Sequence, residues 1–252
     1  MKKALMYLLL FIGIQLVGGA IVPMIWQWIS GTADKTIPLI ITMTMVVSII
    51  TIAVFLFCRW AEVSPRWLRT RPWMVLIWSV IAALGAIIPS TWLQEQMPEL
   101  PNMMEAEFGM IMKERLGYFV VGLLAPLAEE LVFRGAVLRA LLRWHKNAWV
   151  GIAISAVLFA IIHMNPAQMP HAFFVGLLLG WMYYRTDSIV PGVVFHWVNN
   201  SVAYVLYNLY PDPSLKLIDI LGGQQQSVWM ALVFSLLIFL PALFQMNLRL
   251  KK

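Results

Sequence analysis

The sequence is poor in charged residues and in cysteine. Only 12% of its 252 residues are charged and 61% are hydrophobic, whereas soluble domains have about 25% charged residues. A soluble fold of this length cannot bury so much apolar surface, but a bilayer accepts it as spanning helices of about 20 apolar residues each. The single cysteine, Cys58, excludes an intrachain disulfide and a cysteine metal site.

The net charge of +6 does not indicate nucleic-acid binding. The basic residues form short clusters between apolar runs, as they do in membrane proteins whose topology they set. We therefore expect no nucleic-acid partner. The apolar run after Lys2 and Lys3 continues to about residue 29, which is too long for a signal peptide, so we predict a retained first helix.

The apolar runs predict an all-α fold, a polytopic transmembrane bundle of about eight helices that forms a single membrane domain over residues 1–252. The runs fall at residues 4–29, 37–58, 73–93, 116–140, 148–164, 170–184, 188–208 and 226–247. Several are long enough to cross a bilayer, while the fifth and sixth are short. Pro166 and Pro170 separate the fifth run from the sixth, because proline interrupts a helix.

The loops between the runs alternate in charge. Basic residues gather at both termini and after the second, fourth and sixth helices: Lys2, Lys3, Arg59, Arg66, Arg69, Arg71, Arg139, Arg143, Lys146, Arg185, Arg249, Lys251 and Lys252. The longest of the other loops, residues 94–115, is rich in glutamate. With eight crossings, all the basic segments fall on one side. The positive-inside rule then predicts a protein of the cytoplasmic (inner or plasma) membrane with both termini in the cytoplasm.

Three of the predicted helices contain ionisable or amide side chains within their apolar runs. These are Glu129, Glu130 and Arg134 in the fourth helix, His163 in the fifth, and His196 with Asn200 in the seventh. A charge at the centre of a bilayer costs about 2.5–3.5 kcal/mol on insertion scales. Such residues usually face the protein interior and mark a functional path.

Helical spacing divides the residues of the fourth helix. Glu130 and Arg134 are four residues apart and share a face, so they can form an internal ion pair. Glu129 points about 100° away from that face and is left as an unpaired carboxylate. Pro126, just upstream, is expected to bend the helix and expose backbone groups near the site.

The other two helices repeat the four-residue spacing, in Phe159 with His163 and in His196 with Asn200. Glu129 and His163 can bind and deprotonate a water molecule. The ring N–H of His196 and the amide of Asn200 suit a carbonyl oxygen that becomes negative during attack.

These pairs form three motifs in order. Glu129-Glu130-Leu-Val-Phe-Arg134 matches EExxxR, Phe159-Ala-Ile-Ile-His163 matches FxxxH, and His196-Trp-Val-Asn-Asn200 matches HxxxN. Together they resemble the CAAX protease and bacteriocin-processing family (CPBP, or Abi), which includes the Rce1-type prenyl-protein endopeptidases. The region that carries the motifs spans about residues 115–208.

The resemblance implies an intramembrane endopeptidase that acts on a membrane-associated protein or peptide, and we favour a reaction without a cofactor. The catalytic residues it implies are Glu129, His163, His196 and Asn200, with Glu130, Arg134 and Phe159 in support. In this glutamic-type scheme Glu129 activates water with help from His163. His196 and Asn200 form the oxyanion site.

We favour a site without a metal, because a carboxylate and a histidine can activate water directly and the sequence has no HExxH. The alternative is zinc held by Glu129, His163 and His196. His171, at the start of the sixth helix, is interpreted as a packing residue, with a place at the entrance of the site as the alternative, and Asn199 is interpreted as a packing amide.

Two other functions stay open. A non-catalytic immunity or scaffold protein of the same family would use the polar residues to hold the bundle together or to bind a partner. A transporter would use them to relay protons, but the sequence shows no inverted repeat. The sequence does not predict which substrate is cleaved or whether that substrate is prenylated. It also predicts no oligomeric state.

Overall fold

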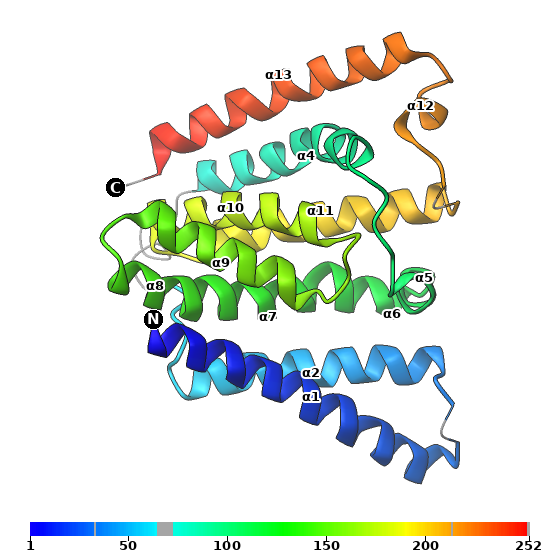
Figure 1. The fold of residues 1–252 in the computed structure, drawn as a ribbon, viewed down its shortest axis with the longest axis vertical. Helices are drawn as coiled ribbons and strands as arrows, with labels where there is room; N and C mark the ends of the chain where they lie inside the picture. The colour runs from blue at the N-terminus through cyan, green and yellow to red at the C-terminus, as the bar shows by residue number, and fades with distance from the viewer. Residues whose placement is uncertain (33, 65–72, 213, 251–252) are drawn as a thin grey trace.

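The computed structural model describes residues 1–32, 34–64, 73–212 and 214–250 (Figure 1). Seven of its long helices are α1 (Lys2–Ser30), α2 (Ile37–Phe57), α4 (Trp73–Glu95), α9 (Ala148–Ile162), α10 (Met169–Thr186), α11 (Val190–Leu209) and α13 (Gln225–Arg249). An eighth runs without interruption from Arg115 to Trp144. These helices occupy the eight apolar runs, so the prediction of an all-α helical bundle is confirmed for the described residues.

The eighth helix changes its winding along its length. It consists of α6 (Arg115–Tyr118), η1 (Phe119–Leu124), α7 (Ala125–Val132), η2 (Phe133–Leu138) and α8 (Arg139–Trp144), where η1 and η2 are π-helical. Two short helices that the sequence did not predict, α5 (Glu105–Met112) and α12 (Leu217–Ile220), lie in the connections on either side of the motif region.

The bundle is layered, and its middle layer is the least apolar. Figure 1 shows α4 and α13 on one side, α1 and α2 on the other, and α6 to α11 between them. Five helices in the described residues are long and apolar enough to cross a membrane: α1, α2, α4, the Arg115–Trp144 helix and α13. The protein is therefore an integral membrane protein, in which apolar outer helices cover the central ones.

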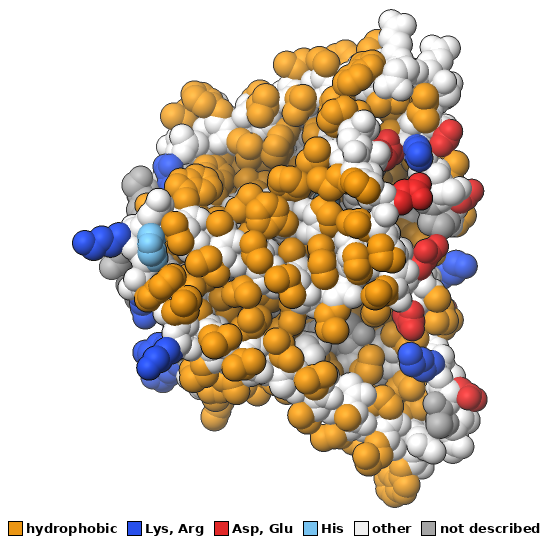
Figure 2. Space-filling view, in the orientation of Figure 1, with side chains coloured by type: hydrophobic (Ala, Val, Ile, Leu, Met, Phe, Trp, Pro, Cys, Tyr) orange, Lys and Arg blue, Asp and Glu red, His pale blue; other side chains and the backbone are white. Residues whose placement is uncertain are grey.

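The two ends of the bundle differ in charge. Both termini lie at one end (Figure 1), where Lys and Arg gather, while Asp and Glu gather at the other (Figure 2). Arg139 pairs with Glu62, which joins α8 to the segment after α2. Arg185, at the end of α10, donates to Asn247 Oδ1 at 2.6 Å in α13. These contacts place several predicted basic segments together.

Five basic residues used in the topology prediction lie outside the described residues: Arg66, Arg69, Arg71, Lys251 and Lys252.

The apolar core packs around the Arg115–Trp144 helix. In the most apolar stretch of this helix 56% of residues are buried, against 11% in α1, so this helix is the centre of the bundle and α1 lies at its edge. Phe133 is fully buried, and its ring centroid lies 5.8 Å from that of Phe11 and 5.1 Å from that of Phe159. These aromatic contacts join α1 and α9 to the central helix.

Gly85 allows α4 and α13 to approach closely. A Cβ atom at this position would lie 2.8 Å from the backbone nitrogen of Phe239 and 2.9 Å from its Cα. Ser235 Oγ donates a hydrogen bond to the Gly85 carbonyl at 3.0 Å across the same contact. Small residues allow close backbone packing of this kind in membrane helices.

We expect Gly85→Ala to destabilise the protein by about 1–3 kcal/mol, because the backbone of α13 must move away from the added methyl group. The measurement is the midpoint of thermal unfolding of the purified protein in detergent. Gly19→Ala is the matched control, since a Cβ there meets nothing within 4 Å, and it should leave the midpoint unchanged or raise it slightly. Equal midpoints for the two variants would contradict the close contact.

Candidate active site

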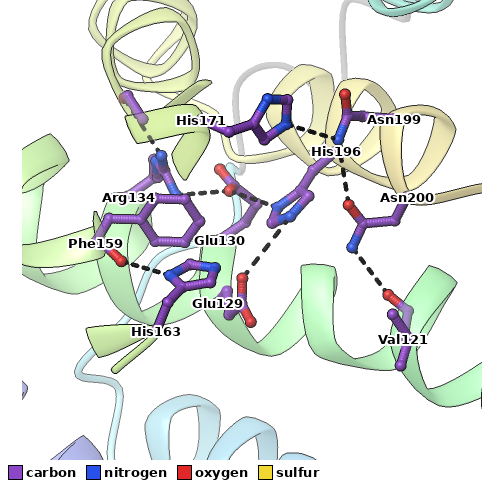
Figure 3. A network of polar contacts seen from close by, with 11 residues as sticks. Val121, Glu129, Glu130, Arg134, Phe159, His163, His171, His196, Asn199 and Asn200 are labelled. Carbon is purple, nitrogen blue, oxygen red and sulfur yellow. Dashed lines mark hydrogen bonds and ion pairs between the residues drawn. The ribbon is translucent and has the colours of Figure 1, made fainter. Parts of the chain in front are cut away.

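The π-helical turn η1 leaves one backbone carbonyl beside the first motif without a hydrogen-bond partner in its own helix. The N–H of Ala125 bonds to Val120 O rather than to Val121 O, and the next residue, Pro126, has no N–H to donate. The amide of Asn200 instead donates to Val121 O at 3.0 Å (Figure 3). The predicted exposure of backbone groups near Pro126 is thus confirmed, since the Val121 carbonyl is available to a motif residue, while the predicted bend stays a prediction.

The second π-helical turn, η2, also has carbonyls that bond outside the helix. Ser155 Oγ of α9 donates to Phe133 O at 3.4 Å, and the N–H of Glu62 donates to Gly135 O at 3.3 Å. Buried backbone carbonyls need such partners when the helical pattern changes. The glutamates of α7 are therefore held between two turns that neighbouring segments anchor, an arrangement typical of π-bulges at functional sites.

Glu130 and Arg134 form the predicted ion pair in the centre of the protein. Arg134 Nη1 donates to Glu130 Oε1 at 2.7 Å, and the two side chains are only 1% and 0% exposed. Arg134 Nη2 donates to the Gly176 carbonyl at 3.3 Å. The guanidinium carbon lies 4.4 Å from the centroid of the Phe159 ring. The charge of Arg134 is therefore compensated by a carboxylate, a carbonyl and an aromatic face.

His196 lies between the two glutamates. Its Nδ1 donates to Glu130 Oε1 at 3.2 Å, and its Nε2 lies 3.8 Å from Glu129 Oε2 (Figure 3). The second distance exceeds that of a hydrogen bond, but a water molecule beside both atoms can bond to each. The sequence did not predict the bond to Glu130, because the two residues lie on different helices.

The two adjacent glutamates have different surroundings. Glu130 is fully buried and accepts from both Arg134 and His196, whereas the side chain of Glu129 is 24% exposed. Among the described residues, Arg134 hydrogen-bonds to Glu130 and Gly176 and not to Glu129, as helical spacing predicted. Glu129 is thus the carboxylate that water and a substrate can reach.

Gly192 allows α11 to reach the buried carboxylate. A Cβ atom at Gly192 would lie 2.8 Å from Glu130 Oε2, an atom that has no hydrogen-bond partner among the described residues. His196 follows one helical turn later and shares a face with Gly192. The missing side chain at position 192 thus lets His196 reach both glutamates.

His163 ends α9 and has one nitrogen already engaged. Its Nδ1 lies 2.7 Å from the Phe159 carbonyl, which can only accept, so Nδ1 carries the proton and Nε2 of the neutral ring has the free lone pair. The ring packs edge-on against Phe159 at 4.9 Å, and His196 packs against the same ring at 5.9 Å. Phe159 therefore brings the two histidines into one cluster, although no hydrogen bond joins His163 to Glu129 among the described residues.

Asn199 and His171 extend the polar cluster. The Asn199 amide donates to His171 Nε2 at 3.5 Å and to Asn200 Oδ1 at 3.4 Å. Both residues also line a cavity of about 280 Å³ between α4, α10, α11 and α13, whose other walls include Phe174 and Phe195. The bond between Asn199 and His171 joins α11 to α10, so no spacing within one helix could have revealed it.

The zinc alternative requires three ligands from Glu129, His163 and His196. Within the described ranges, no group of three or more His, Cys, Asp or Glu side chains is placed to hold a metal ion. Nδ1 of each histidine is already bonded, to Phe159 O in one case and to Glu130 in the other. Nε2 of both histidines stays available as a ligand, so the choice between the metal-free site and the zinc site stays a prediction.

Removing Arg134 alone should cost more stability than removing the whole ion pair. Arg134→Met leaves Glu130 buried without its main partner, which we expect to destabilise the protein by about 3–5 kcal/mol. In the double variant Glu130→Leu/Arg134→Met both charges are absent, so the loss should be smaller. Denaturant unfolding of the purified proteins tests this, and equal losses in the two variants would show that the pair is not coupled.

Comparison with known proteins gives a match over the motif region. Residues 112–202 match the family model described as type II CAAX prenyl endopeptidase Rce1-like. The UPF0177 protein YxdF of Lactococcus lactis subsp. lactis (strain IL1403) is 27% identical over 103 residues, which are 40% of this chain and 51% of that protein. The chain thus matches about half the length of this relative. No solved structure matches the chain significantly.

The matched residues include all of the predicted site, from Glu129 to Asn200. The resemblance that the three motifs indicate, to the family of CAAX prenyl endopeptidases of the Rce1-like type, is therefore confirmed over residues 112–202.

Proposed function

We propose that the protein is an intramembrane endopeptidase that hydrolyses a peptide bond in a membrane-associated protein or peptide. The observation that carries the proposal is the difference between its adjacent glutamates. Glu130 is buried and bonded to Arg134 and His196, whereas Glu129 is partly exposed beside an imidazole. The Rce1-like match supports the same class of reaction.

Glu129 begins the reaction as the general base. A water molecule beside Glu129 Oε2 and His196 Nε2 gives a proton to the carboxylate, and its oxygen adds to the carbonyl carbon of the substrate. His163 supports this step with Nε2, which can accept a hydrogen bond from the water because Nδ1 is engaged by Phe159 O. The product of the addition is a tetrahedral intermediate with a negative oxygen.

Asn200 and His196 stabilise that oxygen. The Asn200 amide has two N–H groups, and one of them bonds to Val121 O, which leaves the second for the oxyanion. His196 can donate from Nε2 when both ring nitrogens are protonated, since Nδ1 donates to Glu130. The C–N bond then breaks, and the proton held by Glu129 passes to the leaving amine and restores the carboxylate.

The setting of the site completes the proposal. We assign the whole chain to one membrane domain whose basic end and both termini face the cytoplasm, as the positive-inside rule requires. The apolar cavity beside His171 and Asn199 suits an apolar residue of the substrate. The polar centre, being covered by apolar helices, suits a substrate that arrives within the bilayer.

Glu129→Gln is expected to reduce cleavage by about 10²–10⁴-fold, because the amide keeps the shape of the side chain but cannot accept the proton. Membranes from cells with the wild-type or the variant protein would be compared by quantitative mass spectrometry for uncleaved peptides that accumulate. Glu105→Gln, a matched change at the exposed start of α5, is the control and should behave as wild type.

Wild-type cleavage by a folded Glu129→Gln protein would show that Glu129 is not the base. If cellular function persists in both Glu129→Gln and His163→Ala and no peptide accumulates, the non-catalytic immunity or scaffold function is favoured instead.

Cleavage is expected to survive a metal chelator, because the proposed steps use only protein groups. Purified protein would be treated with 1,10-phenanthroline and then dialysed, and its rate measured with and without added zinc. Loss of activity that zinc restores would instead support the alternative in which Glu129, His163 and His196 bind zinc.

A further inference from the structure

We propose that the basic end of the bundle binds an anionic glycerophospholipid, with its phosphate between the start of α1 and α8 and an acyl chain along α1. This proposal does not depend on the peptidase activity. It rests on two adjoining hollows, one lined by cations and the other by apolar residues.

The first hollow suits a phosphate group. It has a volume of about 380 Å³ and is lined by the start of α1 and by η2 and α8, with Lys2, Lys3, Arg139 and Arg143 in its wall and no carboxylate. Tyr7 and Trp144 also line it, as aromatic residues commonly do at the membrane interface. Figure 2 shows the basic residues gathered at this end of the molecule.

Three of these cations are the main candidates for phosphate contact. Arg139 already pairs with Glu62 and donates to Trp60 O at 3.0 Å. Lys2, Lys3 and Arg143 therefore supply the charge for the ligand. Basic pockets between transmembrane helices are typical sites for anionic headgroups.

A neighbouring hollow at the same end is less suited to an anion. It measures about 460 Å³ and is lined by the cations Arg139, Arg143 and Lys146, but Glu62 and Asp187 also line it and offset most of their charge. Their negative charges oppose a phosphate there. Because the first hollow has no carboxylate among its described lining residues, we assign the phosphate to that hollow, beside the start of α1.

The second hollow is an apolar groove that continues from the first. It has a volume of about 820 Å³, follows α1 from Lys2 to Ile25, and is bounded on α2 by Val46 and Ile50. Lys2 lines both hollows, and among the described residues it is the only charged one that lines the groove. A cationic pocket that opens into a long apolar groove has the charge and shape of a phospholipid binding site.

A bound lipid would add contacts that α1 lacks. Only 11% of the most apolar stretch of α1 is buried, and a Cβ at Gly13 would meet no described atom within 4 Å beyond its own chain neighbours and the adjacent backbone of α1. An acyl chain along this face would pack against α1 and α2, while the headgroup would join α1 to α8.

The test measures lipid binding to the full-length protein in detergent by native mass spectrometry. Phosphatidylglycerol should bind more tightly than phosphatidylcholine with the same acyl chains. The double variant Lys3→Gln/Arg143→Gln should weaken phosphatidylglycerol binding by about tenfold to thirtyfold and leave phosphatidylcholine binding unchanged. Lys113→Gln/Arg115→Gln, which removes the same two side-chain types near α6, is the matched control and should retain wild-type binding.

Two further experiments show whether the bound phosphate belongs to a lipid or is free inorganic phosphate. Gly13→Leu fills the apolar groove and should weaken binding of long-chain phosphatidylglycerol but not of its dihexanoyl form. Displacement of the lipid by millimolar inorganic phosphate, with no effect of Gly13→Leu, would assign the pocket to free phosphate and overturn the lipid proposal. Equal affinities for the two headgroups, or equal losses in the two double variants, would also overturn it.

Discussion

The structure depends on keeping one ion pair, Glu130 with Arg134, away from lipid. Each charge would be costly in the bilayer if it were exposed there, and the pair is tolerated because several of its polar atoms also find partners on other helices. The Gly176 carbonyl of α10 accepts from Arg134, and His196 of α11 donates to Glu130. The ion pair thereby joins α10 and α11 to the central helix that contains α7.

Burial of the ion pair also gives the two neighbouring carboxylates different roles. Glu130 is enclosed by the pair and by the close approach of α11, whereas Glu129 lies one helical position away and stays partly exposed. The same imidazole faces both, so His196 links the buried structural carboxylate to the accessible one. A single helical step thus yields one carboxylate that holds the fold together and another that is free for chemistry.

Interactions within one helix could be predicted from the sequence, and interactions between helices could not. Spacing gave the Glu130–Arg134 pair, and proline chemistry indicated exposed backbone near Pro126, because both depend on local geometry. The contact of His196 with Glu130 depends on how closely α11 approaches α7, which is set by Gly192. The π-helical turns were likewise missed, since their carbonyls are satisfied by Asn200 and by other segments distant in sequence.

The layers of the bundle explain why the motifs occur only in its middle. Ionisable groups oppose insertion of the helices that carry them, and α10 and α11 are not among the five helices of the described chain that are long and apolar enough to cross a membrane, although the Arg115–Trp144 helix is. The outer helices α1, α2, α4 and α13 are strongly apolar and cover this polar layer on two sides (Figure 1). Insertion and chemistry therefore make opposite demands on composition. The outer helices meet the first demand, while the Arg115–Trp144 helix meets both, because it is apolar enough to span a membrane and its charged residues are buried or covered by the outer helices.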